Sequence, residues 1–219
     1  QDILCGLDHG KLDLSRCQTA SWRMLHMGAQ PIPPVVVQQM QRYFPNLAYE
    51  ISYGLTESGG PGCLNLSADR MDKLGSVGLP AAGWEARIVD TSGEPVPPGR
   101  TGELLIRGPC MMQGYYRNLE ATAAVLRDGW LHTGDMARQD SDGFYYIVGR
   151  LKDVIISGGE NVYPVEVEDC LRAHPAVQDA AVFGVCDSRL GEAVTAQVEL
   201  REEAQCTEEE LLAFCEKLP

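Results

Sequence analysis

The 219-residue sequence contains no apolar run close to the roughly 20 residues that a membrane-spanning helix needs. Basic residues are also scarce: 18 lysines and arginines stand against 31 acidic residues, a net charge of −13. The shortage is greatest over residues 151–219, which hold 5 basic and 15 acidic residues. Nucleic-acid binding requires clustered basic side chains. We therefore expect neither a transmembrane segment nor a nucleic-acid partner.

The eight cysteines form no Cys-x-x-Cys pair and show no metal-ligand spacing with the four histidines. No zinc site is predicted. Cys170 and Cys186 lie within apolar patterns, so we expect them to be buried as small hydrophobic residues. Cysteines without a disulfide pattern are typical of reducing compartments, which predicts reduced thiols and a cytoplasmic location.

The first part of the chain, residues 1–70, predicts the final portion of a large α/β subdomain. Residues 34–44 place apolar side chains four residues apart, as in an amphipathic helix. A strand expected over 48–52 runs into a glycine-rich turn.

Residues 71–149 change to short strand candidates separated by glycine and proline turns. The candidates cover 86–89, 103–107 and 144–148. This pattern predicts a β-barrel-like subdomain.

A third pattern follows a boundary at 150–152 and predicts a small C-terminal α+β domain over 153–219. Helices and strands alternate here, and Thr207 with Glu210 matches a capping box at the start of the last helix. That helix is expected to bury Leu211, Leu212 and Cys215. The whole chain is therefore predicted to be a multidomain protein of the α/β and α+β classes.

The segment YGLTESGG, residues 53–60, places polar groups where a strand is expected to end, which is where open α/β sheets bind ligands. The hydroxyl of Thr56 suits a phosphate oxygen, and the carboxylate of Glu57 suits Mg²⁺. The ring of Tyr53 offers a face for a base. The alternative is a polar turn capped by threonine and glutamate.

A second segment, GWLHTGD, ends at Asp135, which we expect to end a strand. Its carboxylate could accept two hydrogen bonds from vicinal hydroxyls such as those of ribose. An ordinary Thr-Gly-Asp turn is the alternative. We expect His132 to be a structural hydrogen-bonding residue.

The third segment, GRLKDVIISGGENVYPVEVE, occupies residues 149–168. Arg150 is a permanent cation before the expected boundary, and Lys152 lies where a few residues could absorb a rotation. The pair Gly158-Gly159 lets a thin ligand pass close to the main chain. The acids that follow, Glu166, Glu168 and Asp169, are expected to be solvated residues that match the dipole of the next helix.

The order and spacing of these three segments resemble the adenylate-forming superfamily, which includes AMP-forming acyl-CoA synthetases, aryl-CoA ligases, luciferases and peptide-synthetase adenylation domains. Three further segments are similar to motifs of that family. They are MGAQPIPP (27–34), in which Met27 and Gln30 depart from the usual pattern, GELLIRGPCMMQGYY (102–116) and GEAVTAQVEL (191–200). The resemblance extends over essentially the whole chain.

The resemblance implies a set of residues on the adenosine side of ATP or AMP. Gly28 and Ala29 would lie against the adenine, with Tyr53 and Gly54 on its other side. Asp135 would hold both ribose hydroxyls.

The resemblance also implies a phosphate, metal and coenzyme A side. Thr56 would contact the α-phosphate and Glu57 would bind Mg²⁺. Arg150 would reach the ribose or a phosphate, and Lys152 would be the hinge of the small domain. A pantetheine tunnel would be lined by Ser157, Gly158 and Gly159.

Two segments of the family pattern have no counterpart. The Ser/Thr/Gly-rich loop for the β- and γ-phosphates is expected upstream of residue 1, and the Ser/Thr-Gly-Lys segment is expected beyond Pro219. Adenylate formation is an in-line displacement at phosphorus, and one charged group that stabilises it is worth roughly 10²–10³ in rate. Residues 1–219 alone are therefore expected to form almost no adenylate.

The expected parent protein is an AMP-forming acyl-CoA synthetase that joins a fatty or aryl carboxylic acid to coenzyme A with MgATP. Two alternatives stay open. One is a peptide-synthetase-type adenylation domain that loads a carrier protein, and the other is a fragment that binds nucleotide without catalysis.

Overall fold

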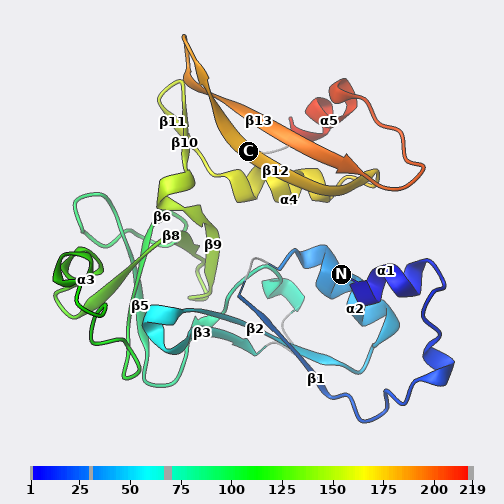
Figure 1. The fold of residues 1–219 in the computed structure, drawn as a ribbon, viewed down its shortest axis with the longest axis horizontal. Coiled ribbons are helices and arrows are strands. Elements are labelled where there is room, and N and C mark those ends of the chain that lie inside the picture. Colours follow the sequence, from blue (N-terminus) through cyan, green and yellow to red (C-terminus); the bar gives the residue numbers. More distant parts are fainter. Residues whose placement is uncertain (1, 30–31, 67–70, 217–219) are drawn as a thin grey trace.

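The computed structural model describes residues 2–29, 32–66 and 71–216. The chain forms three units, each built around its own sheet (Figure 1). Helices and strands are mixed along the chain, which confirms the predicted fold class. Within the described ranges, no helix is long and apolar enough to cross a membrane.

The first unit is a four-stranded sheet in the order β1-β2-β3-β4, in which β1 and β2 are parallel. Helix α2 begins at Pro34, as the helical spacing predicts, and its buried Val37 packs against Tyr49 and Ile51 of β2. The elements are α1 (Asp2–Asp8), a 3-10 helix (Leu14–Arg16), β1 (Met24–Gly28), α2 (Pro34–Tyr43), β2 (Ala48–Leu55), a 3-10 helix (Thr56–Ser58), β3 (Gly60–Leu66), a 3-10 helix (Met71–Lys73) and β4 (Leu79–Pro80).

Strand β2 runs three residues further than expected. The expected strand ended at residue 52, but Tyr53 and Gly54 also lie inside β2, because β3 pairs with β2 as far as Leu55. The two residues are therefore held by backbone hydrogen bonds on a rigid strand.

The second unit is a half-barrel of five antiparallel strands in the order β5-β6-β8-β7, with β9 paired to the other part of β8. Its core contains Leu104, Ile106 and Leu131, and it also takes in Cys63 from β3 of the first unit. Burial raises the pKa of the Cys63 thiol to about 12. The elements are β5 (Glu85–Val89), β6 (Thr101–Arg107), α3 (Leu119–Val125), β7 (Leu126–Arg127), β8 (Trp130–Gln139) and β9 (Tyr145–Arg150).

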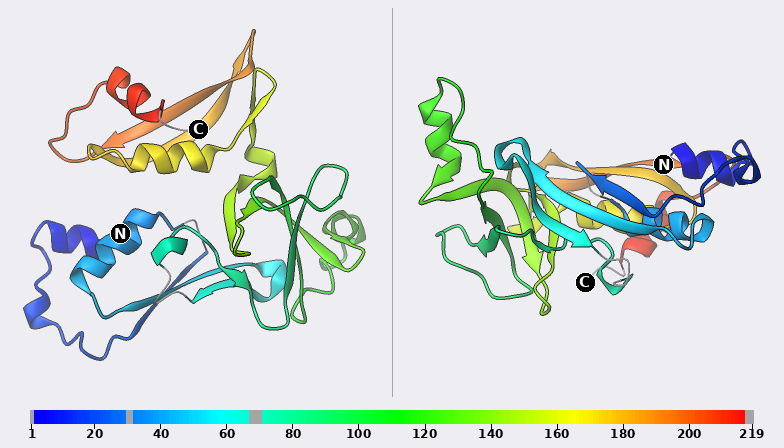
Figure 2. Two further views of the ribbon diagram at one scale, coloured as in Figure 1. Left: turned by 180° about the vertical axis from the view of Figure 1, so that it is seen from behind. Right: turned by 90° about the horizontal axis from the view of Figure 1, so that it is seen from below.

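The third unit follows a short 3-10 helix, Leu151–Asp153, through which the chain leaves the half-barrel (Figures 1 and 2). Its antiparallel sheet has the order β11-β10-β13-β12, and α4 and α5 pack on the same core. The elements are β10 (Ile155–Ser157), β11 (Glu160–Val162), α4 (Pro164–Arg172), β12 (Val177–Asp187), β13 (Gly191–Leu200) and α5 (Glu208–Cys215).

Two burial predictions in this unit need correction. The capping box of Thr207 and Glu210 is present, but Leu212 is 59% exposed and only Leu211 and Cys215 reach the core. One residue along a helix turns the side chain by about 100°, which takes Leu212 off the buried face. Cys186 is also exposed, because it lies near the end of the edge strand β12.

An ion-pair cluster fastens the 3-10 helix of the first unit to the half-barrel. The Nζ atom of Lys73 lies 2.7 Å from Asp140 Oδ2 and 2.6 Å from Asp142 Oδ2. Hydrogen bonds to these two carboxylates raise the pKa of Lys73. Burial opposes ionisation of Asp140, but hydrogen bonds from Lys73 and from backbone amides still hold its pKa below the usual value. The charged pair therefore stabilises the fold.

We predict that Lys73→Met lowers the melting temperature by several degrees at pH 7, whereas Lys11→Met, at an exposed site, leaves it unchanged. Because the pKa of Lys73 is raised in the folded protein, its contribution to stability is present at pH values below its ordinary pKa of about 10.4. The contribution is lost as the pH rises further. The lowered pKa of Asp140 means that its contribution disappears as the pH falls below about 3.9.

Thermal unfolding of both variants at pH 3 and pH 7 tests this cluster. The deficit of Lys73→Met should shrink at pH 3. An equal deficit at both values would show that packing of the lysine stem, and not the ion pair, is responsible.

Candidate active site

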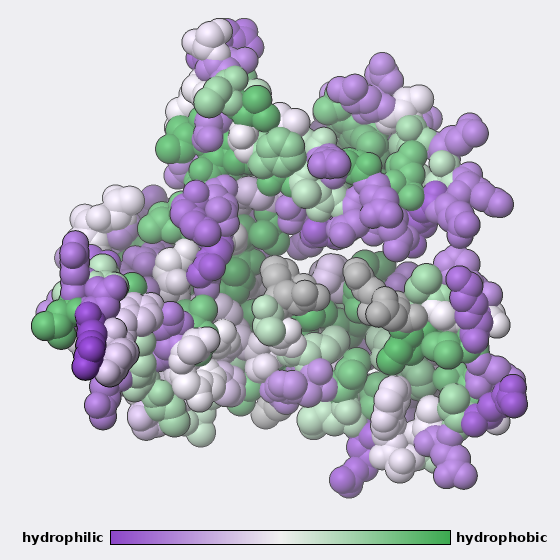
Figure 3. All heavy atoms as spheres, viewed as in Figure 1, coloured by the Kyte–Doolittle hydropathy of each residue, from purple (hydrophilic) through white to green (hydrophobic). Residues whose placement is uncertain are grey.

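A cleft of about 690 Å³ lies between the three units and contains most of the predicted adenosine-side residues. The space-filling view shows this hollow between the C-terminal unit and the rest of the molecule (Figure 3). Its volume is typical of small-molecule sites. The predicted residues on its walls are Ala29, Tyr53, Gly54, Asp135, Arg150 and Lys152.

The carboxylate of Asp135 is a buried charge in the cleft, with a side chain that is only 8% exposed. Tyr53 donates its hydroxyl proton to Oδ2 at 2.6 Å. The Nε atom of Arg150 lies 2.9 Å from Oδ1, where β8 and β9 pair in register. Burial and the neighbouring carboxylate raise the pKa of Tyr53, so its hydroxyl stays a donor.

Asp135 does not end a strand, as the sequence suggested, but lies in the middle of β8 at a bulge. Residues 133–135 stand opposite Leu104 alone, and Gly134 takes a φ of +70°, which disfavours any other residue. The Thr133 hydroxyl donates to the Leu104 carbonyl at 2.6 Å and accepts the Asp135 amide at 3.0 Å. The Thr-Gly-Asp sequence thus builds a bulge that sets the direction of Asp135.

Glu103 supports this bulge from the neighbouring strand. Its Oε1 accepts the Gly134 amide at 3.2 Å, and its Oε2 lies 2.9 Å from Nδ1 of His132. His132 therefore has the structural hydrogen bond that the sequence predicted for it.

The predicted adenine-side pair lies at the end of β1. Gly28 is the last residue of the strand and pairs with Ser52, while Ala29 follows with a φ of +67° and reaches the cleft wall. Gln30 lies outside the described residues.

Thr56 and Glu57 lie in the 3-10 helix directly after β2 and are not on the cleft wall. Buried Ser58 holds this turn, because its hydroxyl donates to the Gly60 carbonyl at 2.6 Å and accepts the Leu55 amide at 2.9 Å. The Oε1 atom of Glu57 accepts a hydrogen bond from the Tyr115 hydroxyl at 2.7 Å.

No group of three or more histidine, cysteine or acidic residues within the described ranges could hold a metal ion. A lone carboxylate still fits Mg²⁺, which proteins usually bind through one or two carboxylates together with substrate phosphates.

The hairpin of β10 and β11 keeps Ser157, Gly158 and Gly159 apart from the cleft wall. Its two glycines have φ values of +60° and +89°, as a tight hairpin turn of two residues requires. The structure therefore separates these residues from Asp135.

Of the acids that open α4, Glu166 and Asp169 are exposed, as the sequence suggested, and only Glu168 is partly buried. Glu168 accepts the Val182 amide of β12 at 2.9 Å and pairs with Arg172 at 3.4 Å. Burial raises the pKa of Asp169, which lines the cleft together with Glu168. The side chain of Glu168 therefore fastens α4 to the edge strand β12.

The sequence did not single out Thr133 or Tyr115, which hold two of the predicted site residues. The partner of Tyr115 is 58 residues away in the chain, so no local pattern indicates it. The sequence signal was their place in two segments quoted for the family resemblance, GWLHTGD and GELLIRGPCMMQGYY.

The half-barrel, the bulged aspartate and the cleft shared with a C-terminal α+β unit agree with the resemblance to the adenylate-forming superfamily. A family model described as "AMP-binding enzyme" matches residues 4–116, and one described as "AMP-binding enzyme C-terminal domain" matches residues 166–218. The chain belongs to the AMP-binding enzyme family.

Named relatives in this family are CoA ligases. The chain is 46% identical over 197 residues to a feruloyl-CoA synthase of Amycolatopsis, covering 89% of this chain and 39% of the relative. It is 40% identical over 203 residues to a long-chain-fatty-acid–CoA ligase of Escherichia coli, covering 91% of this chain and 36% of the relative. The chain thus spans less than half the length of these relatives.

Solved structures of the family superpose closely on the chain. An o-succinylbenzoate CoA synthetase of Bacillus subtilis with its acyl-adenylate intermediate gives a TM-score of 0.84 at 33% identity, covering 100% of this chain and 43% of that one. An amide bond synthetase of Marinactinospora thermotolerans gives 0.86 at 32% identity, covering 99% of this chain and 48% of that one.

Proposed function

We propose that the whole protein is an AMP-forming carboxylate–CoA ligase. A carboxylic acid would react with MgATP to give acyl-AMP and pyrophosphate, and the thiol of coenzyme A would then displace AMP. The observation that carries the proposal is the bulged Asp135 in the cleft, which Tyr53 and Arg150 hold with an oxygen on each side. Membership of the AMP-binding enzyme family supports it.

The adenosine-side residues would bind and orient the nucleotide. Asp135 would accept hydrogen bonds from the two ribose hydroxyls, since a carboxylate can accept about four. Gly28 and Ala29 would lie on one side of the adenine and Tyr53 with Gly54 on the other. Their positions at strand ends and inside β2 support this arrangement, because strands hold a ligand more rigidly than loops.

The remaining roles are distributed along the other segments. Thr56 would donate its hydroxyl to the α-phosphate, Glu57 would give a carboxylate oxygen to Mg²⁺, and Arg150 would reach the ribose or a phosphate. When bound, Mg²⁺ would neutralise negative charge on the phosphates. A pantetheine tunnel would be lined by Ser157, Gly158 and Gly159.

The domain arrangement belongs to the same proposal. Residues 1–70 would complete the large subdomain, 71–149 the barrel-like subdomain and 153–219 the small domain, with 150–152 as the hinge. The short 3-10 helix at 151–153 supports a hinge there, because few residues connect the second and third units. The cytoplasmic location stays a prediction, which the eight free cysteines support.

The acid is proposed to be an aryl or fatty acid, because the names of relatives include both a feruloyl-CoA synthase and a long-chain-fatty-acid–CoA ligase. The test is a panel of hydroxycinnamic, benzoic and fatty acids assayed with the whole protein for ATP–pyrophosphate exchange and for acyl-CoA. Exchange followed by transfer to free coenzyme A supports the proposal. Exchange without acyl-CoA would instead favour loading of a carrier protein.

We predict that Asp135→Ala weakens AMP binding about 10- to 100-fold, because hydrogen bonds to a charged group are worth about 1.5–3 kcal/mol. The matched control is Asp90→Ala, which removes a carboxylate that holds only the local turn through Ser92 and Glu94. Calorimetric titration with AMP measures both variants. Unchanged affinity in Asp135→Ala would remove the ribose assignment.

We predict that Lys152→Pro spares pyrophosphate exchange but abolishes acyl-CoA formation. Proline fixes φ and restricts the preceding residue, so a rotation at this site would be blocked while the static cleft stays intact. Separate assays of the two half-reactions make the comparison. An equal loss in both would contradict the hinge role.

A further inference from the structure

The carboxylate of Glu57 is held at one oxygen only. Its Oε1 accepts the hydroxyl of Tyr115 at 2.7 Å. Among the described residues, Oε2 has no hydrogen-bond donor and no ion-pair partner. One oxygen is therefore fixed by the protein, and the other is free to meet a ligand.

Tyr115 is itself fastened in place. Its backbone amide donates to the Thr122 hydroxyl at 2.9 Å, and that hydroxyl donates to the Asn118 carbonyl at 2.7 Å. Thr122 belongs to helix α3, so the half-barrel fixes the position of the tyrosine.

The segments that carry the two residues also meet through their backbones. The Met112 amide donates to the Glu57 carbonyl at 2.8 Å. A Cβ atom at Gly59 would lie 2.5 Å from the carbonyl oxygen of Cys110, so the two segments are in backbone contact there as well. The contact between Tyr115 and Glu57 is therefore part of a continuous junction and not a chance approach of two flexible side chains.

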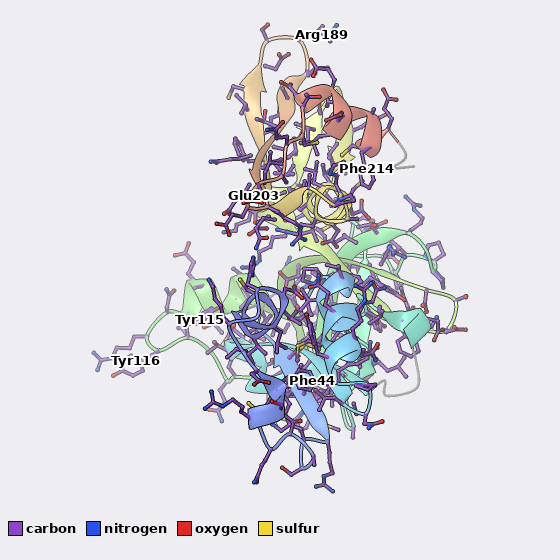
Figure 4. All side chains as sticks on the ribbon, turned by 90° about the vertical axis from the view of Figure 1, so that its right-hand side faces the viewer. Phe44, Tyr115, Tyr116, Arg189, Glu203 and Phe214 are labelled. Carbon is purple, nitrogen blue, oxygen red and sulfur yellow. The ribbon has the colours of Figure 1, made fainter. Side chains whose placement is uncertain are left out.

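The adjacent residue, Tyr116, has no hydrogen bond of this kind to any described residue and is exposed to solvent. Tyr116 is 85% exposed and extends away from the body of the molecule (Figure 4). Its ring contacts only the guanidinium of Arg117 among the interactions of the described residues, 5.1 Å from the ring centroid. The two neighbours thus form a natural pair, one attached to Glu57 and one free.

We propose that Tyr115 is a positioning residue for the metal: it holds Oε1 of Glu57 so that Oε2 alone is presented to Mg²⁺. The proposal rests on the function proposed above for Glu57. Mg²⁺ requires nearly ideal octahedral geometry, so a ligand with one fixed oxygen is pre-organised for single-oxygen coordination. Partners that orient a metal ligand are commonly worth 10- to 100-fold in metal affinity.

The test measures the Mg²⁺ concentration that half-saturates binding of a fluorescent ATP analogue to the whole protein. Tyr115→Phe should raise this concentration about 10-fold or more. Its affinity for AMP without metal should not change, because that ligand does not depend on the Glu57 carboxylate. Tyr116→Phe is the matched control and should leave both quantities unchanged.

An unaltered Mg²⁺ dependence in folded Tyr115→Phe would overturn the proposal. If that variant unfolds, Thr122→Val, which removes the anchor of Tyr115, decides the question: a raised Mg²⁺ requirement supports the proposal and an unchanged one overturns it. The Glu57→Gln variant separates the proposed metal role of Glu57 from the proposed positioning role of Tyr115. If Glu57→Gln does not alter the Mg²⁺ requirement, the metal role of Glu57 fails, and the proposal for Tyr115 fails with it, whatever the AMP affinity.

Discussion

The shared carboxylate of Asp135 is the interaction on which the arrangement of the cleft depends. A charge that is only 8% exposed must be paired or hydrogen-bonded, and its two partners come from β2 of the first unit and from the last residue of β9. The side chain of Asp135 therefore links the first unit to the half-barrel, and Arg150 is the last half-barrel residue before the connection to the C-terminal unit. The bulge at Gly134 and the Thr133 hydroxyl serve this purpose, since they fix the direction of the carboxylate before any ligand arrives.

Local patterns predicted the elements well because their causes are local. The helical spacing after Pro34 gives a helix that buries Val37, and the capping box at Thr207 gives the start of α5. The strand candidates at 86–89 and 103–107 correspond to β5 and β6. The order of the motifs then indicated the family, and the family models match the chain on either side of the predicted hinge.

The remaining features depend on contacts between distant residues, which no local pattern contains. The hydrogen bond from Tyr53 to Asp135 joins residues 82 positions apart, and that from Tyr115 to Glu57 joins residues 58 apart. The exposure of Leu212 and Cys186 depends on where α5 and β12 meet the rest of their unit, not on their own hydrophobicity. The residue types of the candidate site could therefore be predicted from the sequence, whereas their hydrogen-bond partners depend on the tertiary structure.

The two partners of Asp135 differ in how readily a ligand could replace them. Arg150 is about half exposed, so its guanidinium can hydrogen-bond to water when it leaves the carboxylate. Tyr53 packs against the core of the half-barrel, so withdrawing its hydroxyl would leave a largely buried donor without a partner, at a cost of about 1–3 kcal/mol. A ribose that needs a place on the carboxylate would therefore displace Arg150 and leave Tyr53 in position.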